Sequence, residues 1–259
     1  MPLDHLLAAV PGWFNVTGTT ATEIFGSTSI RFDDIVGVIE VDLRVHEDDG
    51  VIAVQEQVPG TRFPGTCHER HLQSDKHFCI GFNAGYGIVS FDHGVVWWGL
   101  LKHFLRLQRV AERTRQWPPQ QEVAHGSAGP HQLAALDAAK ELGIANEYMA
   151  MLAGETAWFS DPDLKIDAAG ILGDGSLPCP VGCATHGILV PRSECCRSHA
   201  VAKLVIEEKL RREKVESYYS FARMLGEECC GTMLTCGLKD STQCATPSRS
   251  THSAPNSPR

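Results

Sequence analysis

The distribution of cysteines constrains this chain more than any other feature. The 259 residues include ten cysteines, but only Cys67 and Cys79 precede residue 179. The other eight lie between Cys179 and Cys244, which is a density that ordinary globular domains do not reach. A short segment of this kind buries little apolar surface. It therefore needs cross-links or a metal ion to hold its fold.

The cellular compartment decides between cross-links and metal. The N-terminal sequence lacks the basic region and the apolar run of a secretion signal, and no stretch approaches the roughly 20 apolar residues of a membrane span. We therefore predict a cytoplasmic protein without a membrane partner, in which thiols stay reduced and act as metal ligands or nucleophiles. The net charge of -8 offers no basic surface for phosphates, so no nucleic-acid partner is predicted.

A change in composition divides the chain. Residues 159–178 are rich in Gly, Pro and Asp and have little periodicity, which is typical of a linker. The sequence thus predicts a first domain over 1–158, a linker over 159–178 and a cysteine-rich module over 179–240. Residues 241–259 are rich in Ser, Thr and Pro, and we predict that they are disordered.

Hydrophobic periodicity predicts strands followed by helices in the first domain. Residues 36–45 and 50–58 alternate in the manner of strands around the turn-forming "EDDG", which indicates an antiparallel pair. Apolar residues recur at helical spacing over 95–115, until "WPP" at 117–119 stops the helix. Further helices are predicted over 131–142, with Gly143 as the C-cap, and over 146–158. This order predicts an α+β fold with the sheet packed on helices.

The segment "CHERHLQSDKHFCIGF", residues 67–82, allows two interpretations. Its cysteines and histidines can bind zinc, but their spacing lacks the two short ligand pairs of common zinc motifs. Alternatively, Cys79 is a reactive thiol between a polar loop and an apolar strand end. Gln73 could then stabilise an oxyanion, and His71 or His77 could orient the loop or carry a proton. A third alternative is that Cys79 only packs as a small apolar side chain.

The second group of cysteines fits a structural zinc site. Cys179 and Cys183 form one short pair, and Cys195 and Cys196 form another after eleven intervening residues. A helix is predicted over 200–225, and more cysteines follow it. The predicted ligands are Cys179, Cys183, Cys195, Cys196, His199, Cys229, Cys230 and Cys236. The alternative is that these cysteines line a small core without metal.

Several short motifs resemble those of ubiquitin-conjugating enzymes: "PGTRFP" at 59–64, His71 to Gln73, "FCIGF", and the Trp97–Trp98 pair ahead of a long helix. The resemblance implies that Cys79 forms a thioester, that His71 opens the family's His-Pro-Asn triplet, and that Gln73 occupies the oxyanion-stabilising Asn position. Leu72 and Gln73 depart from the triplet, and the loop to Cys79 is short. These departures are typical of divergent bacterial relatives.

The C-terminal cysteine pattern extends the resemblance to about residues 36–240. A "CP…CC" element, a helix and a "CCGTM…C" element are similar to bacterial cysteine-rich proteins that accompany ubiquitin-conjugating-like domains. The resemblance implies three partners: a ubiquitin-like modifier, an activating-enzyme-like protein and an unknown acceptor. Transthiolation through a thiolate needs no strong general base. Two alternatives remain, an inactive binding or scaffold protein with a zinc-binding tail, and a Cys–His hydrolase that uses Cys79 with His125 or His131.

Overall fold

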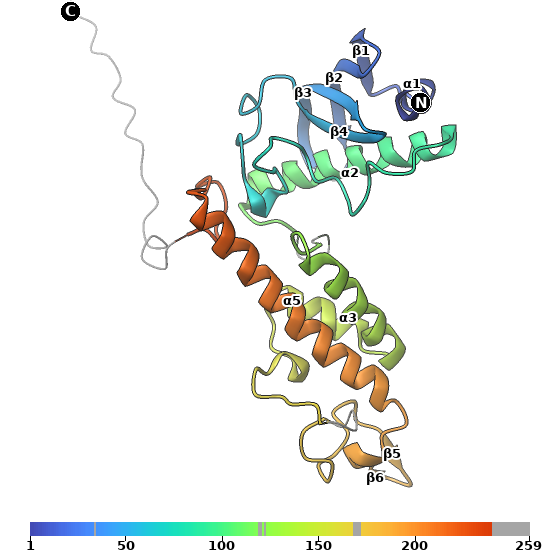
Figure 1. Ribbon diagram of the computed structural model, residues 1–259, viewed down its shortest axis with the longest axis vertical. Coiled ribbons are helices and arrows are strands. Elements are labelled where there is room, and N and C mark those ends of the chain that lie inside the picture. Colours follow the sequence, from blue (N-terminus) through green and yellow to red (C-terminus); the bar gives the residue numbers. More distant parts are fainter. Residues whose placement is uncertain (34, 119–120, 122, 168–171, 240–259) are drawn as a thin grey trace, which may run out of the picture.

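The computed structural model describes residues 1–33, 35–118, 121, 123–167 and 172–239 (Figure 1). The predicted disorder of 241–259 lies outside these residues, as do Cys244 and four residues of the predicted linker, 168–171. The chain forms an upper part with a β-sheet and a lower part built mainly from helices (Figure 1). The predicted α+β class is confirmed, because a four-stranded antiparallel sheet and five α-helices are described.

The sheet is a meander of four strands in sequential order. β1 (Phe14–Thr19), β2 (Glu23–Phe32), β3 (Ile35–Asp48) and β4 (Val51–Glu56) each pair antiparallel with the next strand. β3 and β4 are the predicted pair. Asp49 and Gly50 connect them with φ angles of 48° and 78°, as a two-residue hairpin turn requires. In β4 every second side chain is buried, so one face of the sheet supports a core.

Helices α1 (Pro2–Ala8) and α2 (Phe91–Thr114) cover that face of the sheet (Figure 1). The side-chain oxygen of Ser90 accepts a hydrogen bond from the backbone N–H of His93 and caps α2. The helix begins at Phe91, four residues before the predicted start at 95. Trp97 and Trp98 are both buried, and the Trp98 indole donates to the Leu6 carbonyl at 3.0 Å. The tryptophan pair therefore joins the long helix to the N-terminal helix and to the sheet.

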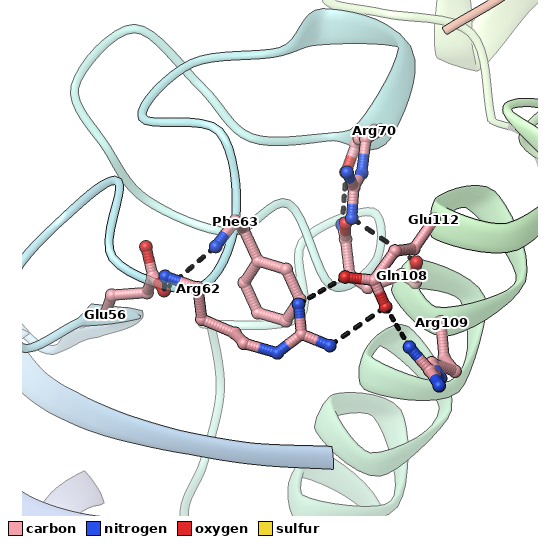
Figure 2. Close-up of polar contacts among 7 residues, drawn as sticks. All are labelled: Glu56, Arg62, Phe63, Arg70, Gln108, Arg109 and Glu112. Carbon is pink, nitrogen blue, oxygen red and sulfur yellow. Dashed lines mark hydrogen bonds and ion pairs between the residues drawn. The ribbon is translucent and has the colours of Figure 1, made fainter. Parts of the chain in front are cut away.

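The loop that follows β4 is fixed to α2 by charged groups (Figure 2). The buried Glu56 carboxylate accepts backbone N–H groups of Arg62 at 2.7 Å and Phe63 at 3.1 Å. The Arg62 guanidinium in turn pairs with Glu112 on α2, and this hydrogen bond is the main reason why the pKa of Glu112 falls to about 2. The loop thus has a defined path onto α2 before it reaches the short helix η1 (His68–Arg70).

The helical part is centred on α5 (Ser198–Met224) and on α3 (Ala128–Leu142), which lies along it (Figure 1). Small side chains allow the close approach, since Ala135, Ala138 and Ala139 of α3 are buried in a shared core with α5. Gly143 ends α3 with a φ of 78°, as predicted. α4 (Ala145–Leu152), η3 (Trp158–Ser160) and α5 complete this core. The predicted first domain, 1–158, includes α3 and α4, although both helices pack with α5. The domain boundary at residue 158 stays a prediction.

α5 connects two distant places in the molecule. Its 27 residues span about 40 Å, and its bounds differ from those of the predicted helix, 200–225, by at most two residues at each end. Its N-terminal end adjoins η4 (Arg192–Glu194) and the hairpin of β5 (Ala184–Thr185) and β6 (Ile188–Leu189), while its C-terminal end lies beside the sheet domain (Figure 1). Among the described residues, no helix combines the length and the apolar surface that crossing a membrane would require.

Candidate functional site

Cys79 lies at the end of a tight hairpin-like segment that begins at Cys67. The backbone N–H of Phe78 donates to the Val54 carbonyl at 2.8 Å, so the segment is attached to the edge of β4. The next N–H, that of Cys79, donates to the His71 carbonyl at 2.9 Å. His71 itself has a left-handed φ of 55°, which turns the chain back toward Cys79. The thiol is half-buried, and its backbone is fixed on both sides.

The Gln73 side chain is hydrogen-bonded to the Cys79 sulfur. Burial raises the pKa of the Cys79 thiol, while hydrogen bonds from the Gly81 backbone and the Gln73 side chain offset part of that rise. The Gln73 side chain is otherwise exposed, so its amide can also reach a group bound to the sulfur. A raised pKa keeps the thiol protonated at rest and makes its thiolate a slower leaving group.

A cavity of about 660 Å³ opens beside Cys79. Its wall includes residues from both parts of the molecule, because Tyr218 of α5 and His125 join residues of the sheet domain. The residues that matter for the argument are His68, His71, Gln73, Cys79, His125 and Tyr218. The cavity is large enough for an extended peptide end or a small amine next to the sulfur.

Four aromatic rings form a row along this cavity. Trp117, His71, His125 and Tyr218 follow one another with centroid separations of 4.9, 4.9 and 5.0 Å. Burial lowers the pKa of His71 to about 4 and, together with the charges of His71 and His68, lowers the pKa of His125 to about 3. Both imidazoles are therefore neutral near pH 7, and both are weak bases.

Neither of the two histidines considered for a Cys–His hydrolase is hydrogen-bonded to Cys79. His131 pairs with Glu207 on α5 at 2.7 Å. The Nε2 atom of His125 is buried without a hydrogen-bond partner, and no histidine nitrogen in the described residues is hydrogen-bonded to the Cys79 sulfur. The geometry therefore lacks the thiol–imidazole contact on which that mechanism depends.

Successive residues of η1 contact the C-terminal part of the chain. His68 is hydrogen-bonded to Glu227 through Nε2 and to the Tyr218 hydroxyl through Nδ1, the latter at 2.5 Å. Glu69 accepts the hydroxyl of Tyr219 at 2.6 Å. Sequence patterns gave no sign of these pairs, because the partners are at least 150 residues apart. The run of polar residues that leads to Cys79 was the one available signal.

Four of the predicted zinc ligands precede α5 or its first turn. We call them the distal cysteine group: Cys179, Cys183, Cys195 and Cys196. The sulfurs of Cys179 and Cys195 are 3.7 Å apart, and the Cys183 thiol is hydrogen-bonded to Cys179. Two sulfurs on one tetrahedral zinc lie roughly 3.8 Å apart, since each Zn–S bond is about 2.3 Å. The donor types and this spacing fit zinc. The described residues nevertheless contain no set of three or more donors already arranged around an ion, and the His199 side chain is exposed.

The other three predicted ligands, Cys229, Cys230 and Cys236, follow the C-terminal end of α5 and are named the proximal cysteine group. Cys230 lies 2.7 Å from the sulfur of Cys67, a residue of the sheet domain. That contact lowers the pKa of Cys230 to about 5 and raises the pKa of Cys67. Burial is the main cause that raises the pKa of Cys236 to about 12, and the neighbouring Cys229 adds to it. The eight predicted ligands therefore do not meet at one place.

Comparison with protein-family models also divides the chain into two parts. Residues 13–119 match a model described as a prokaryotic E2 domain. Residues 124–238 match a cysteine-rich domain described as C-terminal to the E2 domain. The second match contains α3 and α4 as well as α5, in agreement with their shared core. Neither the curated proteins nor the solved structures gave a match.

Proposed function

The chain belongs to the prokaryotic E2 proteins that carry a C-terminal cysteine-rich domain, and on this premise we propose that Cys79 carries a ubiquitin-like modifier as a thioester. The observation that supports the proposal best is the position of Cys79. Its half-buried thiol opens onto a cavity, with the Gln73 amide in hydrogen-bonding contact. A carrier needs this combination of an accessible sulfur and a nearby donor.

The reaction is a transthiolation followed by transfer. The Cys79 thiolate attacks the thioester carbonyl of a modifier held by an activating-enzyme-like protein, and the thiolate of that protein leaves. Gln73 donates an N–H to the oxyanion of the tetrahedral intermediate. His71 has a structural role, since its left-handed backbone turns the chain and its carbonyl holds the Cys79 N–H. An amine of the acceptor then takes the modifier.

Zinc has a separate, structural role in this proposal. Cys179, Cys183, Cys195 and Cys196 would hold the ion at the N-terminal end of α5. When bound, zinc supplies cross-linking of a segment that has few other means of folding. The Cys179 N–H already donates to the Val190 carbonyl at 2.7 Å, and the Val190 N–H donates to the Cys183 carbonyl at 2.8 Å. These bonds orient one pair of thiols before any metal binds.

Intact mass and gel mobility in the source organism test the carrier. Wild type and a Cys79→Ser variant are tagged, expressed and compared on reducing and non-reducing gels. We expect a thiol-labile adduct on the wild type and a thiol-resistant one on the variant, because a serine ester resists thiol exchange. An absence of adducts on both proteins, with Cys79 unreactive toward a small alkylating agent, would instead identify a non-catalytic binding protein.

A further inference from the structure

A carboxylate, an imidazole and a phenol form a hydrogen-bonded row at the junction of the two domains. The carboxylate of Glu227 contacts Nε2 of His68, and Nδ1 of His68 contacts the Tyr218 hydroxyl at 2.5 Å. The His68 side chain is 4% exposed and that of Glu227 is 18% exposed. The row is thus largely shielded from water, where such hydrogen bonds are strongest.

The hydrogen-bonding capacities of the three groups fix the direction of the row. An ionised carboxylate only accepts hydrogen bonds, so Nε2 of His68 carries the proton that points at Glu227. In a neutral imidazole the other nitrogen, Nδ1, then has a free lone pair. The Tyr218 hydroxyl therefore donates to Nδ1. This is the arrangement in which a carboxylate orients an imidazole that can withdraw a proton from a hydroxyl group.

The hydroxyl end of the row is at the site of Cys79. Tyr218 and His68 both line the cavity that contains Cys79. Burial, and then the charges of Glu227, Cys79 and Glu69, raise the pKa of Tyr218 to about 12, so the hydroxyl is protonated at rest. The Tyr218 ring stacks on His125 with an interplanar angle of 21°, which holds the phenol in place against the cavity wall.

Transfer from Cys79 to an amine requires a group that moves protons. The attacking amine must lose a proton, and the departing thiolate, whose pKa burial raises, must gain one. The cavity histidines His71 and His125 are poor candidates, with pKa values of about 4 and about 3. The described residues contain the Glu227–His68–Tyr218 row as a better-oriented alternative.

We propose that Tyr218, His68 and Glu227 form a proton relay that serves the transfer of an acyl group from Cys79 to a primary amine. This inference rests on the proposed carrier function. The amine nitrogen bonds to the thioester carbonyl carbon, and the C–S bond to Cys79 breaks. The ammonium proton passes to the Tyr218 oxygen while the Tyr218 hydroxyl proton passes to His68 Nδ1. Glu227 stabilises the resulting imidazolium, and the proton returns through Tyr218 to the Cys79 thiolate.

The relay is divided between the two domains. His68 belongs to the residues that match the E2 domain, whereas Tyr218 and Glu227 belong to those that match the cysteine-rich domain. The cysteine-rich domain thereby supplies the group that touches the acceptor amine. In this arrangement Tyr218 is the catalytic residue. His68 positions the Tyr218 hydroxyl and accepts its proton, and Glu227 orients His68.

Chemical loading of the purified full-length protein separates the two steps. A short peptide ending in Gly-Gly, activated as a mercaptoethanesulfonate thioester, loads Cys79 by thiol exchange, and free lysine then accepts the peptide. Intact mass follows both steps, and a Cys79→Ala variant measures loading at other cysteines. We expect Tyr218→Phe to load like the wild type and to discharge to lysine about 100-fold more slowly.

Two further variants distinguish a relay from a structural contact. Glu227→Gln keeps an acceptor for His68 Nε2–H but removes the charge, so discharge should slow and its pH profile should move to lower pH. Tyr219→Phe removes a neighbouring hydroxyl of the same helix that binds Glu69 at 2.6 Å, and it should discharge at the wild-type rate.

Each outcome has a separate meaning. Normal loading with wild-type discharge in Tyr218→Phe overturns the relay alone. The relay is also overturned if discharge to lysine slows equally in Tyr218→Phe and Tyr219→Phe and the pH profile of Glu227→Gln is unchanged. Both tyrosine variants would then act only by weakening the packing of α5 on the sheet domain. Failure of the wild type to load at Cys79 overturns the carrier function, and the relay with it.

Discussion

The two cysteine groups at the ends of α5 differ in how close their sulfurs come. In the distal group Cys179 and Cys195 are 3.7 Å apart, which is the edge of a tetrahedral zinc site. In the proximal group Cys230 is 2.7 Å from Cys67, too close for two ligands of one zinc and nearer to the length of a disulfide, about 2.05 Å. The sulfur distances thus differ between a pair within the cysteine-rich domain and a pair that joins it to the sheet domain, a difference that the sequence pattern does not reveal.

The two cysteine groups also differ in which domain their neighbours belong to. The distal group belongs to a small hairpin region that packs on its own domain, since Val181 and Cys195 contact the core shared by α3 and α5. The proximal group is part of an interface, since Met233 is buried in the core of the sheet domain and Leu234 donates to the Arg115 carbonyl at 2.8 Å. We infer that the distal end depends for its fold on α3 and α5 of its own domain, whereas the proximal end depends on the E2 domain.

The largest expected effect is the loss of the distal fold when metal is removed. Chelation, or Cys195→Ser, should abolish amide protection in residues 172–197, because structural zinc contributes on the order of 10 kcal/mol to such segments. Metal analysis should find zinc bound by the wild type, and hydrogen exchange should show the proximal end unchanged. Cys236→Ser is the matched control and should retain the metal. Equal protection with and without chelator would contradict a metal-dependent distal end.

The second-largest expected effect is a disulfide bond that mild oxidation forms only in the proximal cysteine group. Diamide, which accepts two electrons and two protons from a thiol pair, should join Cys67 to Cys230 in the zinc-loaded protein. The partners are 163 residues apart, so closing this loop should raise the free energy of unfolding by up to about 5 kcal/mol. Peptide mapping identifies the bond and urea titration measures its effect. Cys67→Ser is the control, and preferential oxidation of Cys179 with Cys195 would reverse the assignment of the two groups.

The smallest effect is an acid sensitivity of the proximal end, where His71 is buried and neutral. Because its pKa falls from about 6.5 in the unfolded chain to about 4 in the fold, protons favour the unfolded state below pH 6.5, and this penalty grows until about pH 4. The contribution of His71 alone should therefore lower the free energy of unfolding by about 2 kcal/mol between pH 7.5 and pH 5.

A matched variant isolates this contribution of His71. His71→Asn removes the titrating ring, and asparagine tolerates the left-handed backbone at this position. Urea titrations at both pH values should show a smaller drop for the variant than for the wild type. An identical drop in both proteins would assign the acid sensitivity to other groups, such as His125.

The sequence predicted those features that depend on local pattern. The alternation around Asp49 and Gly50 gave β3 and β4, the helical spacing gave α2 and α5, and Gly143 marked the end of α3. Gln73 lies beside Cys79 because only five residues separate them in a hairpin. The match to an E2 domain agrees with the resemblance that these motifs indicated.

What the sequence left out depends on distant contacts. The buried alanines of α3 and Tyr148 of α4 meet α5 in one core, and no local pattern states which partner an apolar face will contact. His68 finds its partners 150 and 159 residues later in the chain. The sequence predicts eight metal ligands without dividing them among ions, and only the length of α5 shows that they form two groups.

The short helix η1 has a consequence for how this protein can vary in length. Cys67, His68 and Glu69 contact the cysteine-rich domain, while the next residue, Arg70, donates to Gln108 of α2 at 2.8 Å (Figure 2). A 3-10 helix turns about 120° per residue, so each side chain has its own direction. Inserting or deleting one residue here would rotate every later contact to the wrong partner. Relatives with this domain pairing should therefore tolerate substitutions in residues 67–70 far better than insertions or deletions.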